Sequence, residues 1–381
     1  MKIPLAKPYM TKDEAQAAYD TILSGWVTQG PRVQEFEEKF ARYVGSKYAI
    51  AVSSCTAALH LSLIVAGIQP GDEVICPSMS YIATANAIKH AGAKPVFAEV
   101  TIADYNIDPV HAESKIKART KAIMIVHQMG APADIDAFKE LCDHYHIQLI
   151  EDAACAIGSE YKGMLIGTHS DLVCFSFHPR KLITTGDGGM ITTANENYCQ
   201  RLQYLRQHGM SVNDRLRHEA NNVVIEEYVE VGYNYRMTDI QAAVGIKQLE
   251  KIDWLVRERR RIAFQYIEFL KNIDCIVLPV EKPFRRNNYQ TFSIYLKKNC
   301  PIARNDLMSE LLARGIATRR GVMTSHREPA YKQESMDCKL PVSEDASDNS
   351  IILPLFVPMT DEEMTYICDN LKDILLGSKI K

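Results

Sequence analysis

The sequence lacks a cysteine pattern of the kind that binds metal. Ten cysteines are spread singly through 381 residues, and no Cys-x-x-Cys pair occurs. A zinc or iron–sulfur site therefore has little support. Scattered cysteines in a chain of this size suit a reducing compartment better than a disulfide framework, so we expect a cytoplasmic protein without a metal.

Long apolar runs and concentrated positive charge are also missing. No apolar run approaches the roughly 20 residues that cross a bilayer, and the first eight residues lack the apolar core of a signal peptide. The formal net charge is -3, and the densest basic spots are 257–261 and 319–320. The first of these has apolar neighbours at helical spacing, as on a solvated helix face. We expect neither a membrane nor a nucleic acid as a partner.

Short apolar runs alternate with helical patterns through the first half of the chain. Such alternation predicts an α/β protein with a mostly parallel sheet and helices on its faces. Ligands of such folds lie beyond the carboxyl ends of the strands. We expect strands at 48–52, 73–76, 95–100, 121–127, 148–152, 172–176 and 190–193, and helices at 56–66, 82–91, 109–117, 135–146 and 196–207.

The second half contains a long helical pattern at 239–270, which we expect to break near Asp253. A polar, irregular stretch at 209–230 precedes it. We place a domain boundary in the long helix, because a chain of this length suits two domains. Residues 1–252, with an N-terminal arm, would form a large domain. Residues 253–381 would form a smaller α+β domain, with a strand at 290–296 and helices at 302–314 and 361–376.

Lys181 is the first candidate for chemistry. It follows the strand at 172–176 and precedes a loop with glycines at 186, 188 and 189. A lysine that forms a Schiff base must be partly neutral near pH 7, so its pKa must fall from about 10.4. The glycines would let the backbone approach a flat ring closely. Taken alone, a lysine in a glycine-rich loop is more often part of a surface turn.

Asp152 and the run 53–58 strengthen that candidate. Asp152 ends an apolar strand, where its carboxylate could hold the proton of a pyridinium nitrogen. The alternative is an N-cap for the following turn. The run 53–58 consists of small and hydroxyl residues between a strand and a helix, which suits a phosphate. Simple N-capping by Ser53 or Ser54 is the commoner explanation of such a run.

Two further side chains could belong to the same site. Ser176 offers a second hydroxyl for a phosphate, five positions before Lys181. Tyr81, at the start of the helix expected after Pro77, could stack on a cofactor ring. A buried core tyrosine is the alternative interpretation.

Together these elements resemble the DegT/DnrJ/EryC1/StrS family of sugar aminotransferases. The resemblance implies a three-layer fold of type I with pyridoxal 5′-phosphate (PLP) as the cofactor. Any one matching run is weak, but their order and spacing are highly specific. The matching runs are 23–30, 54–61, 77–86, 151–154, 175–181 and 232–243.

The resemblance implies a role for each matching residue. Lys181 would carry PLP as a Schiff base and shuttle the proton, and Asp152 would pair with the pyridine nitrogen. Five further residues would contact the cofactor, namely Thr56, Ala57 and Ser176 at the phosphate, Tyr81 against the ring, and Asn234 at the phosphate of the other subunit of a homodimer.

Three positions near the site qualify the resemblance. Cys155 stands where many members carry His or Gln near the phenolic oxygen of the cofactor, and a thiol is a weak donor and acceptor. Asp187 replaces the usual Glu. Arg319 and His326 lie where family members contact sugar or nucleotide, in a segment that differs from the more frequent tyrosine-containing version.

The resemblance also implies a reaction. Members that deoxygenate sugars replace the Schiff-base lysine with histidine, so Lys181 favours amine transfer. The donor would be L-glutamate and the acceptor a nucleotide-linked keto sugar, with the run 181–186 favouring C4 over C3. The product would be an amino sugar for surface glycan or polysaccharide synthesis. Alternatives are a cyclitol, a 3-keto sugar or an unlinked keto sugar as acceptor, and a non-catalytic regulator, which Lys181 and Asp152 disfavour.

Overall fold

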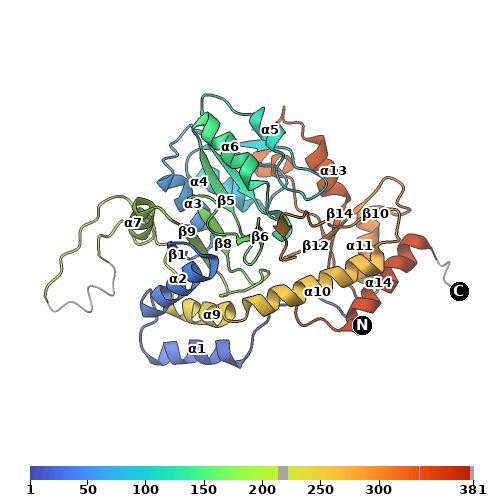
Figure 1. The fold of residues 1–381 in the computed structure, drawn as a ribbon, viewed down its shortest axis with the longest axis horizontal. Coiled ribbons are helices and arrows are strands. Elements are labelled where there is room, and N and C mark those ends of the chain that lie inside the picture. Colours follow the sequence, from blue (N-terminus) through green and yellow to red (C-terminus); the bar gives the residue numbers. More distant parts are fainter. Residues whose placement is uncertain (213–221, 334, 378–381) are drawn as a thin grey trace.

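A seven-stranded sheet forms the centre of the computed structural model, which describes residues 1–212, 222–333 and 335–377. Its strands are β1 (Tyr48–Val52), β2 (Glu73–Pro77), β3 (Lys94–Ala98), β4 (Thr120–Val126), β5 (Gln148–Asp152), β8 (Val173–Ser176) and β9 (Gly189–Thr193). Their order is β1-β9-β8-β5-β4-β2-β3 (Figure 1). All neighbours are parallel except β9, which runs antiparallel to both β8 and β1. The predicted mostly parallel sheet is confirmed.

Helices cover both faces of this sheet because its strands are apolar on both sides. In β2, Val74 and Cys76 face one core while Ile75 faces the other. The first core is completed by α3 (Cys55–Val65), α4 (Ala83–His90) and α7 (Glu196–Leu205). The second is completed by α2 (Pro31–Val44), α6 (Ile135–Tyr145) and α9 (Asp239–Leu249). The arrangement is the expected three-layer fold.

The rest of the chain builds a second, antiparallel sheet. Its strands, in spatial order, are β10 (Ile276–Val277), β12 (Phe292–Leu296), β14 (Ser350–Leu353) and β13 (Arg319–Arg320). Its helices are α11 (Arg304–Ala313), α12 (Pro329–Lys332), α13 (Pro341–Asn349) and α14 (Asp361–Leu376). The long helix α10 (Ile252–Leu270) runs from the large sheet to α14 (Figure 1). The two sheets take their strands from either side of residue 253, and the domain boundary there stays a prediction.

Three smaller elements complete the described fold. A three-stranded sheet joins β6 (Glu160–Tyr161) and β7 (Met164–Leu165) to β11 (Arg285–Arg286) of the second half. α1 (Lys12–Leu23) packs against α9. α5 (Pro109–Glu113) follows β3.

Most predicted elements have boundaries within two residues of the observed ones, and two differences have a visible local basis. α5 ends at Glu113 instead of 117, where Ser114 Oγ bonds back to the His111 carbonyl at 2.7 Å and competes with the helical ladder. The long helix breaks at 250–251, slightly before the expected position. Sequence patterns did not predict α2, although Pro31 in its first turn and Gly45 just past its end are typical helix signals. Part of the irregular stretch 209–230 lies outside the described residues.

Candidate active site

The predicted site residues gather at the carboxyl edge of the parallel strands. Asp152 ends β5 near the middle of the sheet, where it pairs with Val126 of β4 and Cys174 of β8. Ser176 ends β8, and Lys181 follows in the next loop. The structure therefore brings these side chains to the place that the strand-end rule predicts.

Asp152 is a buried carboxylate, 5% exposed, with both oxygens engaged. Oδ2 accepts a hydrogen bond from the Thr84 hydroxyl at 2.8 Å, and Oδ1 accepts one from the Ala154 amide at 3.1 Å. Burial raises the pKa of Asp152, and these two hydrogen bonds together with Lys181 oppose that rise. Oδ1 therefore caps the following turn, as the alternative interpretation predicts, while Oδ2 binds Thr84.

The Lys181 amine lies half-buried beside a thiol. Its Nζ donates to Cys155 Sγ at 3.1 Å. Burial alone would lower the pKa of Lys181, but Cys155, Cys55 and Asp152 outweigh it and the pKa is raised. The predicted fall in this pKa is therefore wrong for this structure, because thiols and a carboxylate surround the amine.

Hydrogen bonds from α9 hold the glycine-rich loop that carries Lys181. The Thr184 amide donates to Gln248 Oε1 of α9 at 3.2 Å, and the Thr184 hydroxyl donates to the Phe177 carbonyl within the loop at 2.8 Å. Gln241 Nε2 donates to the Asp187 carbonyl at 2.8 Å. A loop with this many fixed points holds Lys181 in place, so it is not a free surface turn.

The start of α3 forms a cradle for an anion. Ser54 Oγ accepts the Ala57 amide at 3.1 Å, so N-capping, the commoner explanation, is confirmed for this serine. The amides of Cys55 and Thr56 in the first turn have no partner within a helix. A Cβ on Gly189 would lie 2.6 Å from the Ser54 carbonyl, so only glycine lets β9 pack this closely against the helix start. Such a helix N-terminus suits a phosphate.

These features fit PLP. A helix N-terminus can hold its phosphate, a buried carboxylate can face its ring nitrogen, and an amine stands beside both on the same sheet edge. This combination on a three-layer α/β fold defines a PLP-dependent enzyme of fold type I.

The chain belongs to the DegT/DnrJ/EryC1/StrS aminotransferase family, whose model matches residues 8–372. It is 37% identical to an uncharacterized protein of Methanocaldococcus jannaschii over 98% of this chain and 97% of that one. It is 34% identical to the spore coat polysaccharide biosynthesis protein SpsC of Bacillus subtilis, over 99% and 98%.

Solved structures agree with this membership. A Streptococcus pneumoniae protein, described as a sugar aminotransferase and solved in PMP and PLP forms, matches the fold with a TM-score of 0.92. The identity to its PMP form is 29%, over 98% of this chain and 99% of that one. The present chain is accordingly a PLP-dependent aminotransferase.

The remaining predicted contacts lie at the rim of the site or outside it. Tyr81 precedes α4 and is 62% exposed, so it is not a core tyrosine. Arg319 lies near both Tyr81 and Arg180, and burial followed by Arg180 lowers the pKa of Arg319. Asn234 is exposed, and its Oδ1 accepts from Arg236 at 3.2 Å. No contact of the described chain joins Asn234 to Lys181 or Asp152.

His326 has a packing role that differs from the predicted one. It is 4% exposed, its Nδ1 lies 2.5 Å from Ser78 Oγ, and its Nε2 lies 3.1 Å from Glu344 Oε1. Both ring nitrogens are therefore engaged within the chain, and we withdraw His326 as a substrate contact. The histidine instead ties the loop after β2 to α13.

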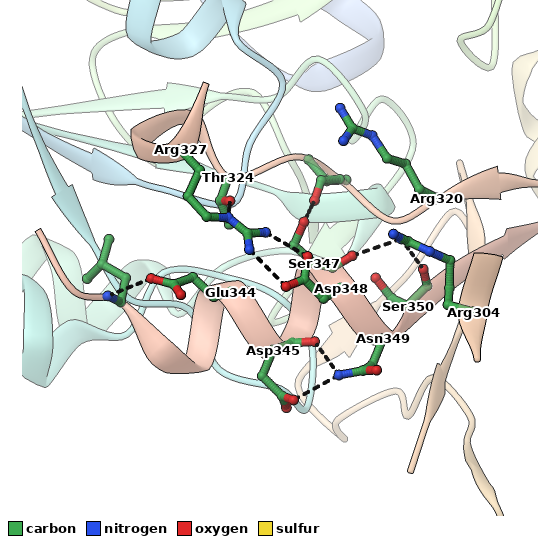
Figure 2. A network of polar contacts seen from close by, with 12 residues as sticks. Arg304, Arg320, Thr324, Arg327, Glu344, Asp345, Ser347, Asp348, Asn349 and Ser350 are labelled. Carbon is green, nitrogen blue, oxygen red and sulfur yellow. Dashed lines mark hydrogen bonds and ion pairs between the residues drawn. The ribbon is translucent and has the colours of Figure 1, made fainter. Parts of the chain in front are cut away.

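Two neighbouring arginines, Arg327 and Arg304, also bind residues of α13. Figure 2 shows Arg327 paired with both carboxylate oxygens of Asp348, at 2.8 and 2.7 Å. Arg304 donates to the Ser347 carbonyl near the end of α13 at 3.1 Å. A cation there compensates the partial negative charge of the helix C-terminus. Arg319 therefore remains the candidate substrate contact in this region.

Sequence reasoning missed two buried acceptor contacts, one in the site and one at a helix start. Thr84 bonds Asp152 directly. Asp239 caps α2, because its Oδ1 accepts the amides of Gly30 and Val33 at 2.8 and 3.0 Å. Gln241 and Thr238 form a capping box that starts α9, and that Thr-x-x-Gln pattern was a readable signal. The Thr84 contact spans 68 residues and has no local signal.

Within residues 1–212, 222–333 and 335–377, no helix is long and apolar enough to cross a bilayer. Within the same residues, no group of three His, Cys, Asp or Glu side chains could hold a metal ion.

Proposed function

We propose that this enzyme transfers the amino group of L-glutamate to C4 of a nucleotide-linked 4-keto-6-deoxy sugar. The product would be an amino sugar for surface glycan or polysaccharide synthesis in the cytoplasm. The observation that carries the proposal is the lysine at position 181, beside Asp152 on the same strand edge. The name of the Bacillus subtilis relative supports the polysaccharide context. All ten cysteines are free thiols, which suits a reducing compartment.

Each part of the site has a proposed task. PLP, when bound, supplies an electron sink that stabilises negative charge at the carbon losing a proton. Asp152 keeps the ring nitrogen protonated because a carboxylate there favours the positive ring. Lys181 would move a proton between Cα of the amino acid and C4′ of the cofactor, as base and then acid. Ser176 and the first turn of α3 hold the phosphate.

Arg319 is the residue that we propose for the anionic part of the substrate. Its guanidinium lies near Arg180, the neighbour of Lys181 in sequence, and near Tyr81. Two arginines this close together repel each other, and an anion between them would relieve that repulsion. Both the carboxylates of glutamate and the diphosphate of a nucleotide sugar satisfy this requirement.

We further propose a homodimer in which Asn234 completes the partner's phosphate site. Asn234 is exposed in the single chain. Large apolar side chains are also exposed on α1 and along the segment 223–231, where a partner could cover them. These exposed residues are Tyr19, Ile22, Leu23, Val223, Ile225 and Val231.

Mixed dimers test this arrangement. A dimer of one Lys181→Ala chain and one Asn234→Ala chain contains a single site with both native residues. Co-expression should therefore restore the lysine-linked visible band of PLP at PLP concentrations where neither variant shows that band alone. A mixed dimer with no such gain, or a monomer by sedimentation, contradicts the proposal.

A substrate panel tests the reaction. The enzyme should turn over UDP-, GDP- or dTDP-linked 4-keto sugars with L-glutamate as the amine donor, and one nucleotide should be preferred. Product analysis by NMR should place the new amine at C4. Failure on all three, with turnover of a cyclitol ketone, would move the function to the alternative acceptor class.

A further inference from the structure

A chain of two buried hydroxyls leads to the carboxylate of Asp152. Ser80 Oγ lies 2.7 Å from Thr84 Oγ1, and Thr84 Oγ1 lies 2.8 Å from Asp152 Oδ2. Ser80 and Thr84 are each 1% exposed. Ser80 lies in the loop after β2 and Thr84 in the first turn of α4, so they reach Asp152 from the connection that follows β2, two strands away from β5 in the large sheet.

The protons of this chain can be assigned from its chemistry. An ionised carboxylate only accepts hydrogen bonds, and a hydroxyl carries one proton. The Thr84 hydroxyl therefore donates its hydrogen bond to Asp152 and must accept one from the Ser80 hydroxyl. Hydrogen bonds in such a series polarise one another, which makes the Thr84 hydroxyl a stronger donor.

The backbone around these hydroxyls is fixed. The Ser80 amide donates to the Ser78 carbonyl at 3.0 Å, and the Thr84 amide donates to the Tyr81 carbonyl at 3.1 Å. The Ser78 amide in turn donates to the Ala98 carbonyl of β3 at 3.0 Å. These main-chain hydrogen bonds hold the backbone of Ser80 and Thr84 in place beside Asp152.

The Thr84 hydrogen bond has a clear electrostatic effect. Burial raises the pKa of Asp152, and the Thr84 hydroxyl is the foremost of the groups that oppose it, ahead of the Ala154 amide and Lys181. A carboxylate that pairs with a protonated ring nitrogen must be ionised. The hydroxyl therefore acts on the charge state that the reaction needs.

We propose that Thr84, polarised by Ser80, is a positioning residue that keeps Asp152 ionised and oriented toward the ring nitrogen of PLP. The proposal rests on the assignment of Asp152 as the partner of that nitrogen. It distinguishes Thr84 from a residue that merely fills space, because only the hydroxyl, and not the shape of the side chain, carries the effect.

Matched substitutions separate these two roles. Thr84→Val keeps the shape and removes the hydroxyl, Thr84→Ser keeps the hydroxyl, and Ser80→Ala removes the second donor. Thr192→Val is the control, because Thr192 is equally buried but its hydroxyl donates to the Gly167 carbonyl at 2.8 Å, away from Asp152. Each variant is measured for the PLP dissociation constant, the pH dependence of the PLP absorption spectrum, and thermal unfolding without PLP.

Thr84→Val should raise the PLP dissociation constant about ten- to a hundredfold, as expected for a lost hydrogen bond to a charged group. Its spectral titration should move to higher pH, because the pKa of Asp152 rises when a donor to its charged form is removed. Thr84→Ser should restore both properties, and Ser80→Ala should fall between them. Thr192→Val should lower thermal stability without moving the titration.

Two outcomes overturn the proposal. One is a Thr84→Val enzyme with the wild-type titration and PLP affinity. The other is a Thr84→Ser enzyme that behaves like Thr84→Val. Asp152→Asn separates this failure from failure of the underlying assignment. If Asp152→Asn leaves spectrum and turnover unchanged, the assignment of Asp152 fails. If Asp152→Asn abolishes turnover while Thr84→Val does nothing, the Thr84 proposal alone fails.

Discussion

Gly189→Ala should weaken PLP binding by displacing the start of α3. The added Cβ would lie 2.6 Å from the carbonyl of Ser54 and 2.7 Å from the amide nitrogen of Cys55. All of these are main-chain atoms, which cannot rotate away. Reaching an ordinary contact of 3.4 Å from 2.6 Å requires a shift of about 0.8 Å between β9 and the helix start.

That displacement is large on the scale of a hydrogen bond. N–H···O distances fall between about 2.7 and 3.2 Å, so a shift of about 0.8 Å removes a bond to the phosphate. A hydrogen bond to a charged group contributes about 1.5–3 kcal/mol. One lost bond therefore predicts a PLP dissociation constant that is about ten- to a hundredfold higher. The assay is a fluorescence or absorbance titration of PLP-free protein.

Gly67→Ala is the matched control at the other end of α3. Gly67 has φ +83° and open space around its Cβ position, so alanine there is strained but collides with nothing. It should cost about 1–2 kcal/mol of stability and leave PLP affinity unchanged. Wild-type PLP affinity in Gly189→Ala, or an equal loss in Gly67→Ala, would refute this account of the phosphate cradle.

Two further predictions concern charge. Burial alone would raise the pKa of Glu14, but hydrogen bonds led by Lys251 lower it from 4.5 to about 2. The stabilisation by ionised Glu14 is therefore present above pH 4.5 and lost as the pH falls toward 2. In urea unfolding, Glu14→Gln should be about 2 kcal/mol less stable than wild type at pH 7 and nearly as stable as wild type at pH 2. An equal difference in stability at both pH values contradicts this prediction. Cys155→Ala removes a hydrogen-bond acceptor of the Lys181 amine, so the pKa of Lys181 should fall. The reaction of this amine with added PLP should therefore begin at lower pH than in wild type. An unchanged pH profile of that reaction would exclude this role for the thiol.

The site could be predicted where position along the chain decides the contact. Asp152 and Ser176 end parallel strands, and the carboxyl ends of parallel strands meet at one edge. Lys181 follows the second of these strands, so its place near Asp152 follows from the same rule. The alternation of short apolar runs with helical patterns predicts both the parallel strands and the helices on the two faces of the sheet.

Contacts between distant segments could not be predicted in the same way. Thr84 lies in α4, after a strand two places away from β5, and its helix carries no pattern that marks a buried donor to Asp152. His326 was assigned as a substrate contact from the family resemblance, and no local pattern shows its partners Ser78 and Glu344, which come from distant parts of the chain. The pKa of Lys181 was predicted in the wrong direction for the same reason, since Cys155 and Cys55 approach it only in three dimensions.

The central claim, that Lys181 carries PLP for amine transfer, is tested most directly by absorption spectroscopy. Purified protein with PLP should show a visible band, and L-glutamate should bleach that band as the cofactor takes up the amine. Lys181→Ala should bind PLP without the lysine-linked band and should not respond to glutamate through turnover. A wild-type protein that shows no band and no change with glutamate would contradict the claim.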